Sequence, residues 1–440
     1  HGSTRTMEGE GSSSGAGAGP SYQMPYEQTP LDEEHGDDAG ELIDAETVEV
    51  LEDNEMAPVD SDDDDAGAEG EGEDAEEDAV AAPGVAPVAD ESVVQWRGHA
   101  GAVYTLAACP ADPALLASGG GDDKAFLWRM DSGAQHKELL GHRDTVDAVG
   151  FSHDGVLLAT AGLDGIVAVW NVADGSLACT VEGPSEAINW LAWHQRGHVL
   201  LVGSEDTTCW MWKVPEGECM QIFAAHAASV TCGAFSGDGK AIVTGSDDAT
   251  VRVWNPRTGQ VVHCLQSGTP AAIEEADGAV SCIASHATSP VALVGLVDGR
   301  VNLVQLEKGT VLASWYEHRA CVEGVGFCTP SAANLPLAAS AGLDGVICIW
   351  DTNTLAMRHR CALQDGMSAL RWHPTMPFFV TAGLDGVARV WDSRSGTEVR
   401  AFTGHTQRLL DAMLVPVATG ETAVVTSSDD HTARVFRLPP

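Results

Sequence analysis

The residues of this chain that could do chemistry are histidines, hydroxyl residues and aspartates that recur at similar spacings. In an enzyme, such side chains act as bases and nucleophiles when a cleft brings them together. However, the chain contains no HExxH or GxSxG motif, and Gly119–Gly121 lacks the Lys-Ser/Thr pair of a phosphate-binding loop. The eleven cysteines form no CxxC pair, so their spacing predicts no zinc site. We therefore expect no catalytic residue, metal or cofactor, and we expect the histidines and aspartates to serve the fold.

The same residues mark an internal repeat. Eight segments run from a small or apolar stretch, through a turn that contains aspartate, into a short alternating strand. Their final residues lie 41 to 50 positions apart, a period that fits one four-stranded propeller blade per repeat. The chain is therefore predicted to be an all-β, eight-bladed β-propeller over residues 91–440. In each repeat the turn aspartate stands six positions before the final residue, giving the pairs Asp122 and Trp128, Asp164 and Trp170, Asp206 and Trp212, Asp248 and Trp254, Asp298 and Val304, Asp344 and Trp350, Asp385 and Trp391, and Asp430 and Phe436.

Over residues 92–438 the chain resembles the WD-repeat (WD40) family. The resemblance implies a buried set of four side chains in each blade, here called the blade lock: a histidine, a Ser or Thr hydroxyl, the turn aspartate and the final tryptophan. Repeat seven lacks the histidine, repeat eight ends in Phe436, and Val202 and Val294 replace the hydroxyl in repeats three and five. We expect repeats three and five to form the softer blades. The four complete sets are His99, Ser118, Asp122 and Trp128; His142, Thr160, Asp164 and Trp170; His226, Thr244, Asp248 and Trp254; and His318, Ser340, Asp344 and Trp350.

The two ends of the repeat region predict how the ring closes. Each blade needs an outermost strand, and an apolar alternation that leads into a Gly-His pair has this appearance. One such stretch, Ser92–His99, comes before any blade has been built, whereas only Arg437–Pro440 follow the final strand. We therefore expect Ser92–Trp96 to complete the eighth blade, which removes two exposed sheet edges.

Residues 1–90 differ in composition from the repeats and are predicted to be a separate, disordered, acidic segment. They hold 28 of the 65 acidic residues and a single basic residue, Arg5, and such a segment buries too little apolar surface to offset its chain entropy. The formal net charge of the chain, −42, disfavours direct binding to nucleic acid and to anionic membranes. No apolar run approaches about 18 residues, and no secretory signal is visible. We expect a soluble monomer in the cytoplasm, with the nucleus as an alternative location.

One face of such a propeller is expected to bind a partner. Its candidate positions flank the first apolar residue of each innermost strand or precede each turn aspartate. In repeat eight, Leu410 and Asp411 are alternatives for the flanking position. Carboxylates on this face could pair with the cations of a basic peptide while leucines contact their stems; the alternative is that these are ordinary solvated loop charges. The predicted set contains no basic residue and consists of Tyr104, Asp147, Leu163, Glu205, Asp247, Glu323, Leu343, Leu384, Asp411 and Asp429.

Three segments, 119–130, 207–219 and 404–436, resemble one branch of the family, that of the angio-associated migratory cell proteins. The fungal member of this branch is a dedicated chaperone of a basic ribosomal protein. The resemblance therefore implies capture of the basic N-terminal tail of a large-subunit ribosomal protein for ribosome assembly. The name of the animal members points instead to a signalling scaffold in cell migration. A further alternative is a substrate receptor that binds the adaptor of a cullin-RING ubiquitin ligase, because Trp391–Arg394 matches the Trp-Asp-x-Arg box of such receptors.

Overall fold

The computed structural model describes residues 89–267, 278–328, 335–417 and 420–439. The chain divides into two units, residues 1–80 and 81–440, and the first lies outside the described residues. The predicted disordered acidic segment therefore also lies outside them, apart from Ala89 and Asp90. All regular structure in the described part is β-strand, so that part contains no helix that could cross a membrane.

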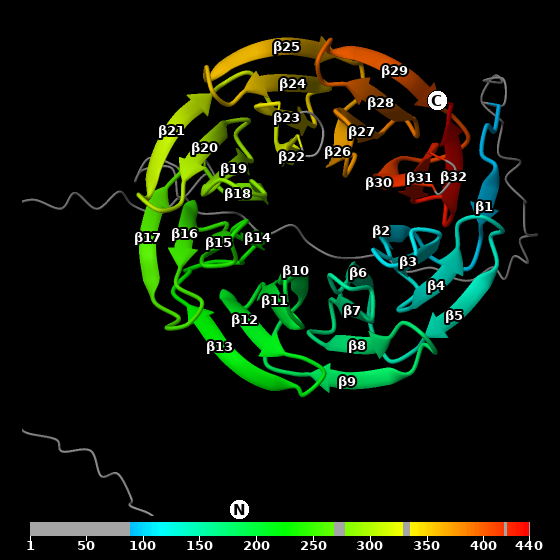
Figure 1. Ribbon diagram of the computed structural model, residues 1–440, viewed down its shortest axis with the longest axis horizontal. Helices are drawn as coiled ribbons and strands as arrows, with labels where there is room; N and C mark the ends of the chain where they lie inside the picture. The colour runs from blue at the N-terminus through cyan, green and yellow to red at the C-terminus, as the bar shows by residue number, and fades with distance from the viewer. Residues whose placement is uncertain (1–88, 268–277, 329–334, 418–419, 440) are drawn as a thin grey trace, which may run out of the picture. The chain divides into compact units, whose positions relative to one another are not determined.

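Eight four-stranded antiparallel sheets follow one another around a ring, as Figure 1 shows. We call the strands of each sheet a to d, from the centre of the ring outward. The predicted all-β, eight-bladed propeller is confirmed. The strands of blades one to four are β2 (Val103–Ala108), β3 (Leu115–Gly120), β4 (Ala125–Arg129) and β5 (Gln135–Leu139); β6 (Val146–Phe151), β7 (Leu157–Gly162), β8 (Val167–Asn171) and β9 (Leu177–Val181); β10 (Ile188–Trp193), β11 (Val199–Ser204), β12 (Thr208–Lys213) and β13 (Glu218–Ala224); and β14 (Cys232–Phe235), β15 (Ile242–Gly245), β16 (Thr250–Trp254) and β17 (Val261–Gln266).

Blades five to eight continue the same order around the ring. In blade eight the outermost strand comes from the beginning of the propeller rather than from its end. The strands are β18 (Val280–Ser285), β19 (Val291–Leu296), β20 (Val301–Gln305) and β21 (Thr310–Trp315); β22 (Val322–Phe327), β23 (Leu337–Gly342), β24 (Val346–Asp351) and β25 (Ala356–Ala362); β26 (Met367–Trp372), β27 (Phe378–Gly383), β28 (Ala388–Asp392) and β29 (Thr397–Phe402); and β30 (Leu409–Pro416), β31 (Thr422–Ser428), β32 (Ala433–Leu438) and β1 (Val94–Trp96).

The ring closes through β1, as the sequence predicts. This strand pairs antiparallel with β32, with Val94 opposite Val435 and Trp96 opposite Ala433. The pairing begins one residue earlier, because the Val93 N–H donates to the Val435 carbonyl at 2.8 Å. β32 therefore has a hydrogen-bonded neighbour on both sides, and the last blade has the same four strands as the others.

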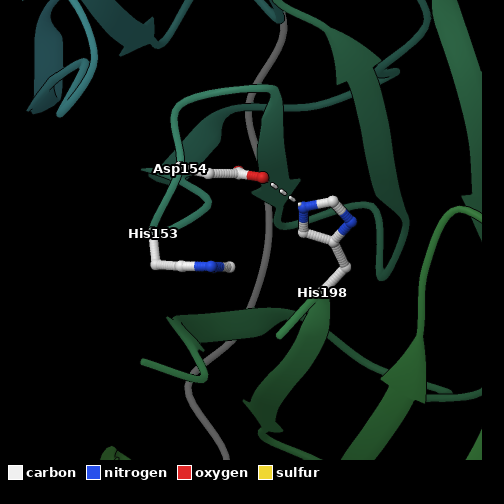
Figure 2. A group of neighbouring side chains, drawn as sticks. All are labelled: His153, Asp154 and His198. Carbon is white, nitrogen blue, oxygen red and sulfur yellow. Dashed lines mark hydrogen bonds and ion pairs between the residues drawn. The ribbon is translucent and has the colours of Figure 1, made fainter. Parts of the chain in front are cut away.

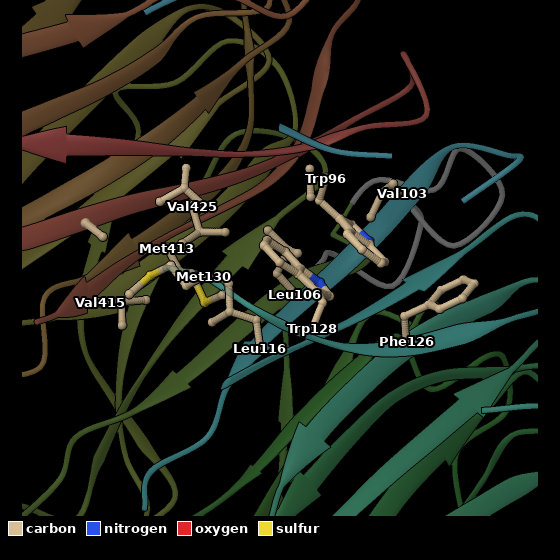
Figure 3. Close-up of a cluster of buried hydrophobic side chains, with 13 residues drawn as sticks. Trp96, Val103, Leu106, Leu116, Phe126, Trp128, Met130, Met413, Val415 and Val425 are labelled. Carbon is tan, nitrogen blue, oxygen red and sulfur yellow. The ribbon is translucent and has the colours of Figure 1, made fainter. Parts of the chain in front are cut away.

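An apolar core fills the seam between blades eight and one (Figure 3). Trp96 of β1 stacks on Trp128 of β4, with ring centroids 5.5 Å apart and planes inclined by 5°. Met413 and Val425 of blade eight belong to the same buried cluster. Apolar burial of this kind is the main source of cohesion between blades, so the closing strand contributes packing as well as backbone hydrogen bonds.

Burial falls from the centre of each blade to its edge. In β3, β7 and β23 every residue is buried, and the small Ala, Ser and Gly side chains of these strands let neighbouring blades approach closely. In β5, by contrast, four of five residues are exposed, because this strand is the outer edge of its sheet. Strand d is thus the solvent-facing edge in blades one to seven.

The turn between strands b and c has one conformation in all eight blades. The residue after each turn aspartate has a left-handed φ between 58° and 90°. Glycine meets this requirement without strain, and four of the blades have it. The eight residues are Asp123, Gly165, Thr207, Ala249, Gly299, Gly345, Gly386 and His431.

Candidate partner-binding site

The blade locks hold one face of the propeller in shape. In blade two, His142 Nδ1 lies 3.1 Å from Asp164 Oδ2, and His142 Nε2 lies 2.8 Å from Thr160 Oγ1. The Trp170 indole N–H donates to the same hydroxyl at 2.9 Å. Asp164 also accepts the backbone N–H of Arg143 at 3.0 Å, which fastens the loop between blades to the b–c turn. Blades four and six repeat the arrangement with the predicted residues His226, Thr244, Asp248 and Trp254, and His318, Ser340, Asp344 and Trp350.

Hydrogen bonding within a lock shifts the titration of its carboxylate. Burial alone would raise the pKa of Asp248, but hydrogen bonds from His226 and Thr250 outweigh it and hold this pKa well below its usual range. The aspartate is therefore ionised at neutral pH. The buried ion accepts several hydrogen bonds at once, which is how a buried carboxylate is normally stabilised.

Blade one departs from the predicted lock. His99 contacts Asp122 at 2.8 Å and Ser118 at 2.9 Å. The indole N–H of Trp128 has no hydrogen-bond partner within the described residues, although the atom is buried. Its ring is instead stacked on Trp96 at the seam. The fourth member of this lock therefore packs with the closing strand and does not extend the polar chain.

The blades with incomplete sets use other side chains. In blade seven, Arg389 takes the place of the missing histidine and binds Asp385 through both terminal nitrogens, at 3.1 and 2.6 Å. In blade eight, His405 contacts Asp430 and Thr426 at 2.9 and 2.7 Å, without an indole. Val202 and Val294 are fully buried in apolar clusters.

The residue that follows the first buried apolar residue at the start of each a strand has one of two roles; in blade four this apolar residue is Val230, two positions before β14 begins. In seven of the eight blades it sits at a register shift between strands a and b, so it stands outside the regular ladder. In four blades this residue is a small polar one that donates to a carbonyl at the start of the next a strand. These donors are Asn189, Thr231, Ser281 and Ser368, which bond to Val230, Val280, Val322 and Leu409.

In the other four blades the same position lines a cavity. Its volume is about 300 Å³, and it lies at the centre of the ring where the a strands begin. No hydrogen bond to the next a strand occupies these side chains within the described part of the chain. They are Tyr104, Asp147, Glu323 and Leu410, from blades one, two, six and eight. We call this hollow the channel mouth.

Asp411 was assigned to the partner-binding face, and this assignment is wrong. Leu410, the alternative, occupies the bulge in β30, whereas Asp411 pairs in register with Ser427 and is buried. Its carboxylate accepts the Leu106 N–H at 3.1 Å and the Arg371 guanidinium at 2.7 Å. Both groups belong to neighbouring blades, so Asp411 joins three a strands, and its carboxylate is already paired although the residue lines the channel mouth.

Asp147 is a partly buried carboxylate at the channel mouth that has no partner among the described residues. Burial raises the pKa of its carboxyl, and no described residue donates a hydrogen bond to it or pairs with its charge. Glu323 lies across the same cavity. A carboxylate that is partly desolvated and uncompensated gains more from a nearby cation than a fully solvated one does.

Further acidic residues lie on the rim. Glu205 and Asp247 are exposed in the b–c turns of blades three and four. The surrounding turn partly desolvates the Asp247 carboxyl, which raises its pKa although the residue reaches solvent. The nearby charges of Asp248 and Glu205 raise this pKa further, so the two turns form a single negative patch. Asp429 differs, because Arg408 of its own blade forms an ion pair with it. The carboxylates of Glu205 and Asp247, unpaired within the described residues, thus lie side by side over blades three and four.

The predicted apolar positions differ in exposure. Leu163 and Leu343 are each 42% exposed in the b–c turns of blades two and six. Leu384, at the equivalent position of blade seven, is less exposed than these two leucines. Tyr104 is 37% exposed. The face therefore offers a few separate apolar contacts around a centre where Asp147 and Glu323 share the channel mouth with Arg371, whose guanidinium is paired with Asp411.

Two other features lie away from this face. A larger cavity of about 660 Å³ lies at the seam of blades eight and one, on the side of the a–b loops, and is lined mainly by apolar side chains. Arg394 of the Trp-Asp-x-Arg match is exposed and bound to Asp392 at 2.8 and 3.0 Å. This geometry is that of an ordinary surface turn, so the adaptor-binding alternative stays a prediction.

The chain matches known proteins over the propeller. A family model for the WD domain, G-beta repeat, matches residues 90–129, 133–171, 175–213, 217–255 and 358–392. The angio-associated migratory cell protein of Homo sapiens is 34% identical over 362 residues, which are 79% of this chain and 80% of the human protein. An uncharacterized WD repeat-containing protein of Schizosaccharomyces pombe is 36% identical over 356 residues, covering 79% of this chain and 87% of that protein.

Solved structures share the fold. Sqt1 of Saccharomyces cerevisiae superposes with a TM-score of 0.72 at 23% identity, covering 80% of this chain and all of that one. Sqt1 of Chaetomium thermophilum, bound to the N-terminus of the ribosomal protein L10, has a TM-score of 0.70 at 26% identity and the same coverage. Fold and site together define a propeller scaffold that binds other proteins. The chain belongs to the WD-repeat family, as a relative of the angio-associated migratory cell proteins.

Proposed function

We propose that this protein is a dedicated chaperone that binds the basic N-terminal tail of a large-subunit ribosomal protein at the channel mouth. The observation that carries the proposal is Asp147, a partly buried carboxylate with no described partner, facing Glu323 across the central cavity. A Lys or Arg side chain would supply the missing charge, and Tyr104 and Leu410 would contact its apolar stem.

The relatives support this choice of partner. The Chaetomium thermophilum Sqt1 structure, at 26% identity, contains the N-terminus of the ribosomal protein L10. Such tails are basic, and the acidic rim would increase their rate of encounter. The protein then acts by binding and not by catalysis. We further propose that it works in the cytoplasm, where ribosomal proteins are synthesised.

The test is a binding titration between the full chain and a fluorescent peptide of the L10 N-terminus. Asp147→Lys combined with Glu323→Lys is expected to abolish binding, because both changes place a cation where the peptide cation must lie. The matched control is Asp131→Lys with Glu218→Lys, which makes the same change in net charge on the opposite face, in the c–d turn of blade one and at the first residue of β13. Binding should survive in this control.

Two outcomes oppose the proposal. Equal affinity of the wild type and the Asp147/Glu323 variant would show that the channel mouth is not the site. Equal loss in the control variant would show that only the overall charge attracts the peptide. Binding of the wild type should also weaken steeply with added salt, because paired charges hold the peptide.

A further inference from the structure

Two histidines and an aspartate meet on the face opposite the channel mouth (Figure 2). His153 and Asp154 lie in the a–b turn of blade two, and His198 lies in the a–b connection of blade three. The a strands begin at the channel mouth, so the a–b connections lie on the opposite face of the propeller. One nitrogen or oxygen atom of each residue lies within 4.8 Å of the corresponding atoms of the other two.

The carboxylate of Asp154 is held in a fixed orientation. Its Oδ1 accepts the Ser152 hydroxyl at 2.7 Å and the Val156 N–H at 3.2 Å. Its Oδ2 is directed at His198, whose Nε2 lies 2.9 Å away. Hydrogen bonds of this kind orient the ligands of a metal site and are part of its affinity.

The three side chains are open to solvent on one side. The side chains of Asp154 and His198 are 37% and 31% exposed, and His153 is exposed. Three ligands from the protein and a solvent-facing side leave room for water to complete a coordination shell. The neighbouring His194 is not available in the same way, because its Nδ1 accepts the Arg196 N–H at 3.2 Å.

The a–b turn of blade four has the same hydrogen bonds around its aspartate but contains no histidine. There Ser236 donates to Asp238 at 2.8 Å and the Lys240 N–H donates to it at 3.0 Å, as Ser152 and Val156 do in blade two. The free side of Asp238 is then occupied by the Lys240 ammonium at 3.0 Å. Histidine ligands are therefore not needed to form the turn, and of these two turns the one in blade two lacks a lysine beside the carboxylate.

We propose that His153, Asp154 and His198 bind a divalent transition-metal ion, with Zn²⁺ as the ion of choice. Two imidazoles and one carboxylate are donors that zinc prefers, whereas magnesium and calcium favour all-oxygen sites. Zinc would replace the proton shared between His198 Nε2 and Asp154, and that proton passes to Nδ1 or to solvent. Residue spacing predicts no metal here, because the ligands come from two blades and lie 44 residues apart.

The test is calorimetric titration of the full chain with Zn²⁺ in an excess of Mg²⁺, which occupies the acidic all-oxygen sites. The wild type should bind one ion that His198→Ala does not bind, or binds at least about tenfold more weakly. Asp238→Asn, in the turn without histidines, is the matched control and should behave like the wild type. Exposed cysteines are identical in all three proteins, so any zinc they bind cancels in the comparison.

A second variant separates the metal site from folding. Ser152→Ala removes no ligand but takes away the hydroxyl that donates to Asp154 and accepts the Leu157 N–H, and it should weaken zinc binding about tenfold in a chain whose melting curve shows it folded. Melting curves without metal should show His198→Ala folded, since the only hydrogen bond described for its side chain is with exposed Asp154, and the backbone bond to Val214 is kept. Identical zinc stoichiometry and affinity in the wild type and in His198→Ala would overturn the proposal. Neither result depends on peptide binding at the channel mouth.

Discussion

The guanidinium of Arg371 donates to the carboxylate of Asp411 at 2.7 Å and so joins the a strands of blades seven and eight. Arg371 also donates to the Leu106 carbonyl at 3.2 Å, and Asp411 accepts the Leu106 N–H at 3.1 Å. Three blades thus meet in one polar cluster at the centre of the ring. The seam of the propeller is held by polar contacts on its inner side and by β1 on its outer side.

Asp411→Ala is expected to destabilise the fold rather than act on partner binding alone. The substitution leaves the Leu106 N–H and a guanidinium without their acceptor, which should cost about 2–3 kcal/mol of unfolding free energy. The measurement is urea denaturation, with Asp429→Ala as the control because Asp429 forms only a surface pair with Arg408. A loss of 0.5 kcal/mol or less in Asp411→Ala, roughly that of a surface site, would contradict this role.

Removal of the closing strand is expected to lower the melting temperature strongly. Deletion of residues 92–98 takes away β1 and the Trp96 ring that covers Trp128. Trp96→Ala alone should cost about 3–5 kcal/mol, because the aromatic side chain leaves a cavity in the seam. Deletion of residues 1–85 should leave the melting temperature unchanged, since the contacts that the described residues make with blade seven begin at Ala89 and Glu91. Equal melting of the two truncated chains would refute closure by β1.

The blade locks should contribute unequally to the free energy of unfolding, and the same Ser→Ala substitution in two blades can measure the difference. Ser340 bonds to both His318 and Trp350, at 2.8 and 3.0 Å, whereas Ser118 bonds to His99 but not to Trp128. Ser340→Ala should therefore cost about 1 kcal/mol more than Ser118→Ala, since it strands one more buried donor. Chemical denaturation of both variants measures the difference, and a larger loss from Ser118→Ala would count against this account.

Peptide binding at the channel mouth should weaken as the pH falls, starting above the usual aspartate range. Burial raises the pKa of Asp147, so this carboxyl takes up a proton at a higher pH than an exposed aspartate would. The neutral acid cannot pair with a peptide cation. The raised pKa also means that protonation of Asp147 favours the folded state, so loss of binding here does not report unfolding.

The pH experiment is a set of peptide titrations between about pH 7 and pH 4.5, with Asp147→Asn as the control. The control should bind weakly at all of these pH values and lose most of the pH dependence. A wild-type affinity that is constant over this interval would exclude Asp147 from the interaction.

Much of the fold could be predicted because its signals are local and repeated. The turn aspartate, followed six positions later by an aromatic residue or, in repeat five, by Val304, marks each c strand, and eight copies fix the number of blades. Ser92–Trp96 looked like an outermost strand without a blade, and the structure places it in blade eight. Such patterns depend on short segments, which the sequence displays directly.

The candidate site was less accessible from sequence because it depends on contacts between blades. The register at Leu410 and Asp411 is set by a bulge that no local pattern shows. Residue type did offer one signal: Asn, Thr and Ser at the flanking position bond to the next blade, whereas Tyr, Asp, Glu and Leu do not. Trp128 could not be foreseen as the exception, because its partner Trp96 lies in a different blade.

The pairing of β1 with β32 also sets the point during synthesis at which the ring can close. β1 precedes every other described strand in the chain and β32 follows every other, so a ribosome must make both before the ring can close. Until then Leu410 has no fixed place beside Tyr104, and the channel mouth does not exist on a growing chain. Since synthesis proceeds at about 5–20 residues per second, this interval lasts tens of seconds. On the function proposed above, a newly made copy could bind a tail only after both of these strands have been synthesised.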